Sequence, residues 1–193
     1  RKEIEQVRNP KKRFLNRKGP LRILIFGGSL GSKAFNQVLP SMFKKINGKN
    51  KLSIIHQSGE KMFELLKESY EGADFKVETR KYIFDMEKKY NWADIVIARS
   101  GALTVSELIA SGSASILIPY PFAVDDHQFF NAKILKDAGA AEIIREKDLE
   151  EKLVLNLVKL DRKKCENMAL KAKELHSYDA CAEVLKVCNT LLK

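Results

Sequence analysis

The sequence is poor in cysteine and lacks a long apolar run. Its three cysteines, Cys165, Cys181 and Cys188, are odd in number and include no C-x-x-C pair, so no disulfide framework is predicted. We expect reduced core thiols in a cytoplasmic protein. No apolar run reaches the ~18 residues that a membrane-spanning helix needs, and we predict no signal peptide. The chain opens on R-K-E-I-E-Q without an initiating Met, and we expect it to be part of a longer protein.

The common nucleotide-binding loops are also missing. Phe26 occupies the first glycine position of the dinucleotide fingerprint G-x-G-x-x-G, and Gly31-Ser32-Lys33 does not supply the G-K-S/T of a Walker A loop. What remains is a G-G-S-x-G turn at 27–31, between an apolar run and a helical pattern. Such a turn lets backbone N–H groups approach phosphate oxygens, although glycine that serves packing alone is the other interpretation.

Motifs for metal binding are absent as well. There is no D-x-D motif, and Asp125-Asp126-His127 are adjacent residues without a second, spaced ligand group. We therefore expect no metal ion and no other cofactor. Asp126 is instead predicted to cap the helix that follows it. His56, at the end of a predicted strand, is expected to be a hydrogen-bonded structural histidine.

Positive charge is concentrated at the start of the chain. The net charge is +10, and residues 1–22 hold nine Lys or Arg against two Glu. This basic arm could contact nucleic acid, an anionic membrane surface or an anionic ligand, or it could be a solvated linker. No base-stacking aromatic pattern accompanies the charges, so nucleic acid is not an expected partner.

Apolar runs and helical patterns alternate along the chain. With 45% hydrophobic residues the chain can bury a core, and the alternation through residue 144 predicts an α/β fold with a doubly wound parallel sheet. Residues 1–20 are predicted to be a linker, and 21–193 one domain. Strands are expected at 21–26, 51–56, 75–83, 95–98, 115–118 and 140–144. Helices are expected at 34–46, 62–70, 85–90, 102–111, 126–138, 148–160, 162–176 and 179–192.

The central stretch, Asp94 to Gln128, carries the polar residues that end two predicted strands. Ligands of open α/β sheets bind at the carboxyl ends of the strands, and a helix N-terminus favours an anion. Thr104 and Glu107 share one face near the start of the helix. This arrangement suits a ligand made of phosphate and a hydroxyl-rich sugar.

Glu107 admits two interpretations. Thr104-Val105-Ser106-Glu107 matches a capping box, in which Glu107 folds back to the N–H of Thr104. If the helix instead begins at Gly101 or Ala102, Glu107 is left to accept hydrogen bonds from two vicinal hydroxyls.

Over nearly its whole length the chain resembles the nucleotide-sugar half of the MurG family. The matching blocks are R-K-E-I at 1–4, G-G-S-L-G-S at 27–32, H-Q-S-G at 56–59, Y-I-F-D-M at 82–86, R-S-G-A-L-T-V-S-E at 99–107, P-Y-P-F-A-V-D-D-H-Q at 119–128 and A-G-A-A at 138–141. The family transfers N-acetylglucosamine from UDP-N-acetylglucosamine to a lipid-linked muramyl-peptide. Its two Rossmann-like domains face each other across a cleft in the GT-B arrangement, and the resemblance implies that this chain is the C-terminal, donor-binding one.

The resemblance also implies a set of site residues. Ile83 would hold the uracil edge through its backbone, and Glu107 the ribose hydroxyls. The diphosphate would be held by the turn with Gly28 and Ser29 and by the start of the helix. The sugar would lie at Gln128 with His127 beside it. The complete set implied for the donor is Arg1, Gly28, Ser29, Ile83, Ala102, Leu103, Thr104, Glu107, His127 and Gln128.

The rest of the reaction is implied to lie outside this sequence. In the family the anomeric centre is inverted, and the general base and the acceptor-binding loops belong to the N-terminal domain. The catalytic base is therefore unassigned here. The implied location is the cytoplasmic face of the cell membrane, with its anionic surface as a further partner. A free-standing donor subunit that needs a separate acceptor subunit is the alternative.

Overall fold

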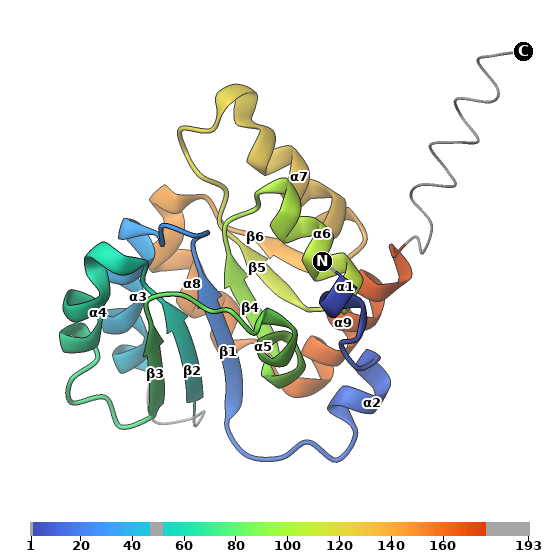
Figure 1. Ribbon diagram of the computed structural model, residues 1–193, viewed down its shortest axis with the longest axis horizontal. Coiled ribbons are helices and arrows are strands. Elements are labelled where there is room, and N and C mark those ends of the chain that lie inside the picture. Colours follow the sequence, from blue (N-terminus) through green and yellow to red (C-terminus); the bar gives the residue numbers. More distant parts are fainter. Residues whose placement is uncertain (1, 47–51, 177–193) are drawn as a thin grey trace, which may run out of the picture.

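Six strands form one parallel sheet in the computed structural model, which describes residues 2–46 and 52–176 (Figure 1). The strand order is β3-β2-β1-β4-β5-β6. This is the order of a doubly wound Rossmann-type sheet, and it reverses direction between β1 and β4. The strands are β1 (Leu21–Phe26), β2 (Leu52–Gln57), β3 (Lys76–Arg80), β4 (Ile95–Ala98), β5 (Ser115–Leu117) and β6 (Ala141–Ile143). The predicted fold class is confirmed.

The carboxyl ends of the three central strands are level with one another. Phe26, the last residue of β1, is paired with Gln57 of β2 on one side and with Ala98 of β4 on the other. All residues of β2 and β4 are buried, as expected for strands covered on both faces. The turns that follow β1, β2 and β4 therefore meet at one edge of the sheet.

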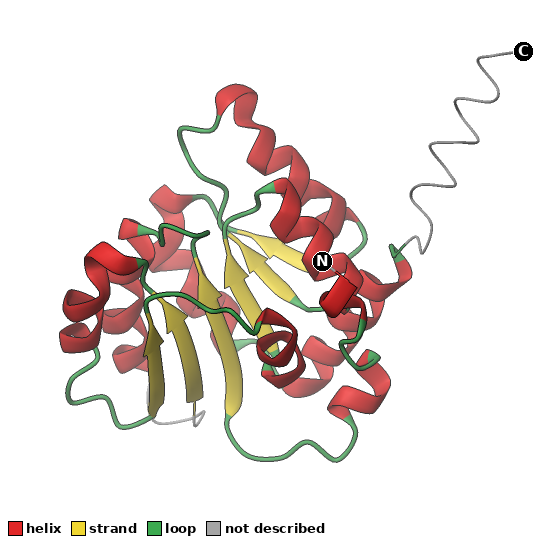
Figure 2. Ribbon diagram, viewed as in Figure 1, coloured by secondary structure: helices red, strands yellow, loops and turns green. Residues whose placement is uncertain are grey.

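Helices cover both faces of the sheet (Figure 2). Ile23 and Ile25 of β1 point to a core shared with α3, α4, α8 and α9, whereas Leu24 and Phe26 point to a core shared with α1, α5, α6 and α7. The helices are α1 (Lys2–Glu5), α2 (Pro10–Phe14), α3 (Lys33–Ile46), α4 (Phe63–Ser69), α5 (Met86–Trp92), α6 (Ala102–Ser111), α7 (His127–Asp137), α8 (Leu149–Val158) and α9 (Arg162–Glu174).

The segment before β1 differs from a solvated arm. Its helix α1 buries Ile4 in one of the two cores, and α2 buries Phe14 in the other. Arg13 is 5% exposed, and the side chain of Arg17 is 9% exposed. The interpretation of this segment as solvated is therefore wrong for these residues, because apolar side chains and buried arginines bind it to the domain. Its role as a linker stays a prediction.

Other expectations are changed in detail. The predicted strand 75–83 ends at Arg80, because the chain then turns so that the N–H of Ile83 reaches Gln57. Cys165 is a buried free thiol, whereas Cys181, Cys188 and the predicted helix 179–192 lie outside the described residues. Within 2–46 and 52–176 no helix is both long and apolar enough to span a bilayer.

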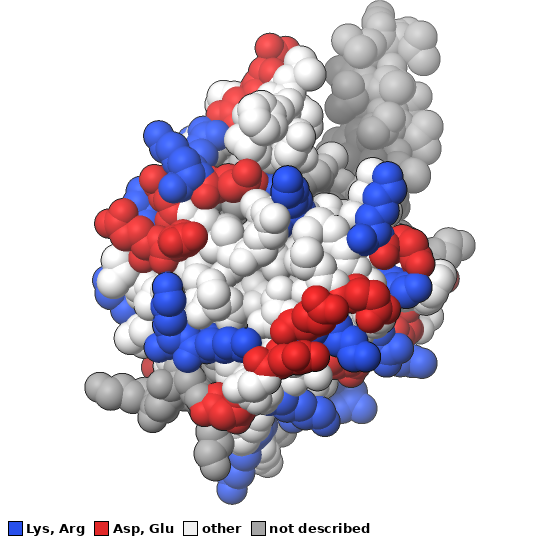
Figure 3. Space-filling view, turned by 90° about the vertical axis from the view of Figure 1, so that its left-hand side faces the viewer, with Lys and Arg blue, Asp and Glu red and all other residues white. Residues whose placement is uncertain are grey.

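On one side of the molecule the surface charges are mixed rather than gathered (Figure 3). Figure 3 shows the side of the molecule that lies at the left in Figure 1, where α4 and β3 are found. Positive and negative side chains alternate there around a central area without charge (Figure 3). The excess of positive charge is thus not concentrated on this side.

Candidate functional site

A cavity of about 730 Å³ opens at the carboxyl edge of the sheet, between the turn after β1 and the turn after β4. This is the point at which the strand order reverses, where ligands of open α/β sheets bind. The cavity is lined by Gly27, Gly28, Ser29, Leu30, Gly31, Ser32, Lys33, Ala34, Gln37, Arg99, Gly101, Thr104, Tyr120, Phe122, Gln128 and Glu146.

The glycine turn on one side of the cavity is held against the turn after β2 by backbone contacts. Gly31 has φ +78°, and a Cβ on it would lie 1.9 Å from the carbonyl oxygen of Ser58. Gly28 has φ +92°, but a Cβ there would meet nothing within 4 Å. Gly31 is therefore required for close approach as well as for its backbone conformation, whereas Gly28 is required for its conformation alone.

Gln57 links this turn to the segment after β3. Its Nε2 donates to the carbonyl oxygen of Gly28 at 2.8 Å, and its Oε1 accepts from the N–H of Ile83 at 3.1 Å. Gln57 is 4% exposed, so both bonds are shielded from solvent. A ligand that used the amide of Ile83 would have to displace Gln57, whereas the carbonyl of Ile83 is not involved in this bond.

The start of α6 faces the cavity from the other side. Its N-cap residue is Gly101, with no side-chain cap, and its first turn holds Ala102, Leu103 and Thr104. The N–H groups of a first helical turn have no partner within the helix, and the helix dipole makes this end favourable for an anion. The capping-box interpretation is wrong, because the N-cap is Gly101, the helix begins at Ala102, two residues before Thr104, and Glu107 lies in its second turn.

Arg99 lines the cavity with a positively charged side chain, but its guanidinium is already bonded to other groups of the protein. Its guanidinium donates to the carbonyl oxygens of Ile118 and Pro119 at 3.2 Å and to Ser32 Oγ at 3.0 Å. It also forms an ion pair with Glu146. Arg99 thus joins the turns after β4 and β5 to the start of α3, and its ion pair with Glu146 leaves little net charge for a ligand.

Gln128 lies in the cavity wall in a defined orientation. Its Oε1 accepts from the N–H of Tyr120 at 3.0 Å, and its carbonyl oxygen accepts from Ser100 Oγ at 2.7 Å. These bonds do not use the Nε2 group of the Gln128 side chain, which is left as a hydrogen-bond donor. His127 is exposed, and its Nδ1 lies 2.8 Å from the carbonyl oxygen of Val124, outside the cavity lining.

Asp126 does not cap α7 with its side chain. It occupies the N-cap position at φ +52° without a capping hydrogen bond, and its carboxylate instead forms two bonds with Arg145, at 2.8 and 2.7 Å. The hydrogen bond from Arg145 holds the pKa of this carboxyl below its ordinary value. The expected cap is therefore wrong, because a bidentate guanidinium is a stronger partner than a backbone N–H.

Glu107 lies one turn beyond Thr104 along α6 and does not line the cavity. Its Oε2 accepts a hydrogen bond from the hydroxyl of the buried Tyr90 of α5 at 3.0 Å. The carboxylate therefore lies on the α5 side of α6, in the direction of the segment after β3.

The predicted site residues fall into two groups. The cavity brings together Gly28, Ser29, Thr104 and Gln128, and the exposed Ala102 and Leu103 flank it on the first turn of α6. Ile83, Glu107 and His127 lie outside the cavity lining, and Arg1 lies outside the described residues. Sequence reasoning missed the residues that hold the site together from other elements, above all Gln57, Tyr90 and Glu146.

The histidine near the end of β2 is structural. His56 is fully buried, and its Nδ1 lies 3.0 Å from the hydroxyl of Tyr70. Burial lowers the pKa of His56 to about 3, so its imidazole is neutral at pH 7. In the described part of the chain no group of three or more His, Cys, Asp or Glu side chains is arranged to hold a metal ion.

Residues 22–184 match the family model for the glycosyltransferase family 28 C-terminal domain. The chain belongs to this family. It is 43% identical over 195 residues to the UDP-N-acetylglucosamine--N-acetylmuramyl-(pentapeptide) pyrophosphoryl-undecaprenol N-acetylglucosamine transferase of Wigglesworthia glossinidia brevipalpis. The match covers 100% of this chain and 54% of that protein. The enzyme of the same name from Saccharophagus degradans is 40% identical, and the match covers 100% of this chain and 50% of that protein.

One solved structure is similar to this chain over nearly its whole length. The crystal structure of Acinetobacter baumannii MurG is similar with a TM-score of 0.87 and 35% identity, over 97% of this chain and 55% of that one. The glycosyltransferase VinC, at 17% identity and a TM-score of 0.59, shares the fold. The resemblance to the C-terminal half of MurG is confirmed, and the chain spans about half the length of the relatives it matches.

Proposed function

We propose that the chain binds UDP-N-acetylglucosamine as the donor half of an inverting N-acetylglucosaminyltransferase that glycosylates a lipid-linked muramyl-pentapeptide in peptidoglycan synthesis. The observation that carries the proposal is the cavity at the reversal of strand order, which a glycine turn and an uncapped helix N-terminus border from opposite sides. The printed names of the relatives, which are N-acetylglucosamine transferases, support the choice of donor.

The diphosphate is proposed to lie between the turn with Gly28 and Ser29 and the first turn of α6. The N–H groups of Ala102, Leu103 and Thr104 would donate to its oxygens, and the dipole of a ten-residue helix would favour its charge. Both groups of donors are backbone atoms fixed by the fold.

N-acetylglucosamine is proposed to occupy one end of the site, and the ribose and uracil the other. The Nε2 group of Gln128 would donate to N-acetylglucosamine, with His127 beside it. Toward the other end, Glu107 would accept from the ribose hydroxyls, and the Tyr90 hydroxyl that binds one of its oxygens would orient it. Uracil would then meet the backbone of Ile83, whose distance from the glycine turn is set by Gln57.

Catalysis by this half would act on the leaving group. When the bond to the sugar breaks, negative charge grows on the diphosphate, and donors already aimed at it stabilise that charge with little reorganisation. Arg99 is engaged by Glu146, so we assign the stabilisation to backbone N–H groups, with Arg1 as an additional cation. The general base and the lipid-linked acceptor would belong to a joined N-terminal half.

Partners and location follow the same proposal. We propose a peripheral position on the cytoplasmic face of the cell membrane, with contact to its anionic surface and no nucleic-acid partner. A single polypeptide is favoured over a free-standing donor subunit, because the relatives are single chains of about twice this length.

Calorimetric titration with UDP-N-acetylglucosamine tests the donor site. We expect binding by the chain and, since a hydrogen bond to a charged group contributes roughly 1.5–3 kcal/mol, a loss of roughly 10- to 150-fold in affinity for Glu107→Gln. Glu150→Gln, which removes the same charge from an exposed position on α8, serves as the control and should bind normally. Binding of oligonucleotides without binding of UDP would overturn the donor assignment, and equal affinity of both variants would overturn the role of Glu107.

A further inference from the structure

A second cavity, of about 220 Å³, lies at the amino edge of the sheet, opposite the edge that carries the donor cavity. Its lining consists of Arg8, Arg13, Arg17, Lys88 and Asn91, which we call the arginine pocket. The residues come from the segment before β1 and from α5. Every one of these side chains carries N–H donors, four of the five are positively charged, and no carboxylate is part of the lining.

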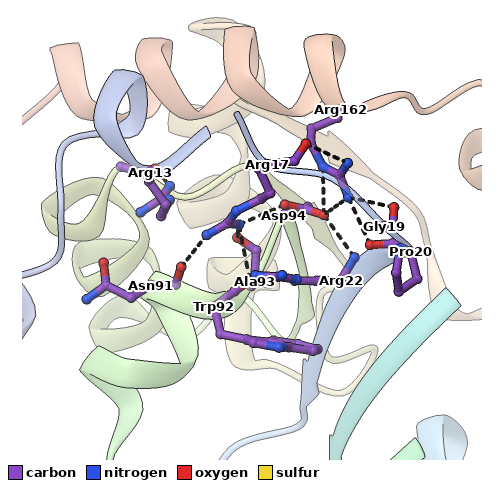
Figure 4. A network of polar contacts seen from close by, with 11 residues as sticks. Arg13, Arg17, Gly19, Pro20, Arg22, Asn91, Trp92, Ala93, Asp94 and Arg162 are labelled. Atoms are coloured by element: carbon purple, nitrogen blue, oxygen red, sulfur yellow. Dashed lines mark hydrogen bonds and ion pairs between the residues drawn. The ribbon is translucent and has the colours of Figure 1, made fainter. Parts of the chain in front are cut away.

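Two of the arginines are held in place because some of their guanidinium N–H groups bond to other groups of the protein. Arg13 donates to the carbonyl oxygens of Ser111 and Gly112 at the end of α6. Arg17 donates to the last carbonyl groups of α5 and to Asp94 Oδ1 at 2.8 Å (Figure 4). These bonds satisfy carbonyl groups that helix ends leave without partners, and they fix the two guanidinium groups in place.

The anchoring bonds do not use every donor of the pocket. The Nε of Arg13 has no hydrogen-bond partner, but it is buried inside the protein and is not a donor open to a ligand in the pocket. The Oδ1 of Asn91 accepts from the backbone N–H of Arg8 at 2.9 Å, which leaves the NH₂ group of Asn91 as a donor.

Arg8 and Lys88 supply cations that no other group neutralises. Both are exposed, and neither charged group has a hydrogen bond or an ion pair with another residue in 2–46 and 52–176. Asp94, which Arg17 shares with Arg162, lies beside the pocket but is not part of its lining. Burial and the charge of Arg17 lower the pKa of Arg13 to about 10, as expected where positive charges gather without a matching anion.

We propose that the arginine pocket binds a phosphoryl group. A tetrahedral anion with several acceptor oxygens can bond to donors that converge from different directions, and arginine is well suited to it because its guanidinium has a fixed, forked geometry. The volume equals about seven water molecules at ~30 Å³ each, which suits one phosphoryl group with its remaining waters. Its source is either an anionic phospholipid headgroup or a free phosphorylated compound.

Trp92 gives a local signal for this binding. It is the single tryptophan of the chain, it follows Asn91 directly, and its carbonyl oxygen accepts from Arg17 at 3.1 Å. Titration of the whole chain with inorganic phosphate, followed by tryptophan fluorescence, should therefore show a saturable change. The donor cavity lies at the other edge of the sheet, so phosphate bound there would not contact Trp92.

Paired variants assign the signal to the pocket. Arg8→Gln with Lys88→Gln removes two lining cations that make no side-chain bonds, and the phosphate dissociation constant should rise at least about tenfold. Lys11→Gln with Lys12→Gln removes the same charge from exposed positions on α2 outside the lining, and it should leave phosphate binding unchanged. Circular dichroism and thermal unfolding should match the unmodified chain in both double variants.

Vesicles distinguish the two sources. If a lipid headgroup is the ligand, vesicles of phosphatidylglycerol should bind the unmodified chain and the control but not the pocket variant, while vesicles of phosphatidylcholine bind none of them. If a free compound is the ligand, phosphate binding alone should depend on the pocket. The proposal is overturned if neither phosphate nor phosphatidylglycerol distinguishes the pocket variant from the control. UDP-N-acetylglucosamine binding should be equal in both double variants, so this outcome is independent of the donor site.

Discussion

Removal of one buried negative charge, by Asp94→Asn, should destabilise the whole domain. The Asp94 side chain is fully buried, directly before β4. Its Oδ1 lies 2.8 Å from Arg17 and its Oδ2 lies 3.1 Å from Arg162, while the same Oδ2 accepts from the N–H of Arg22 at 3.0 Å (Figure 4). One carboxylate thus joins the segment before β1, the start of β1 and the start of α9.

The size of the effect follows from burial. Loss of one partner of a buried ion pair typically destabilises by about 3–5 kcal/mol, because the remaining charge is left without compensation. Arg17 is 9% exposed and Arg162 is 23% exposed, so water can partly solvate the second arginine. We therefore expect a loss of about 3 kcal/mol in the free energy of unfolding, or roughly 6–12 °C in Tm for a domain of this size.

Urea unfolding, followed by circular dichroism, measures this loss. Asp137→Asn is the matched control, since its ion pair with Lys133 has both partners more than half exposed and should contribute at most about 1 kcal/mol. In an Arg162→Met background the effect of Asp94→Asn should become smaller, because one of the two stranded cations is gone. If Asp94→Asn changes the unfolding free energy by less than about 0.5 kcal/mol, the reasoning from buried charge fails.

Two further predictions concern a buried base and a pair of glycines. His56 has a pKa of about 3 when folded and 6.5 when unfolded, so the unfolded state binds more protons between these values and stability is lost as the pH falls through that window. At pH 5 the loss of unfolding free energy should be on the order of 2 kcal/mol relative to pH 8, and His56→Gln should remove this component. Urea unfolding at several pH values measures it, and an unchanged pH dependence in that variant would contradict the assignment of the effect to His56. Gly31→Ala should destabilise more than Gly28→Ala, because both add a Cβ at positive φ, at about 1–2 kcal/mol, but only Gly31 would also place it 1.9 Å from a backbone oxygen. Thermal unfolding of the two variants measures the difference, and equal stabilities would show that the contact between the two turns is not rigid.

Local signals were enough to predict the sheet and its ligand edge. Runs such as Ile95–Ala98 are apolar on both faces, and only a strand covered from both sides buries such a run. Gly112 ends α6 in the left-handed conformation, as a glycine after a helical pattern predicts. The position of the cavity then follows from parallel strand order, since the turns after β1 and β4 must meet.

Contacts between distant segments could not be predicted in the same way. Glu107 meets a hydroxyl 17 residues earlier in the chain, and its capping-box pattern was misleading because the N-cap of the helix is Gly101, not Thr104. Asp126 had the sequence of a cap, but Arg145, 19 residues later, supplies a bidentate partner. Each of these outcomes depends on how helices and turns pack against one another, which residue spacing does not encode.

The bonds of Gln57 have a consequence for ligand affinity. A single amide fixes the separation between the glycine turn and the segment that contains Ile83. A molecule long enough to touch both would find its two contact points already spaced, so less entropy would be lost in ordering the protein around it. The Gln57 side chain thus sets the spacing between the two contact points of such a ligand.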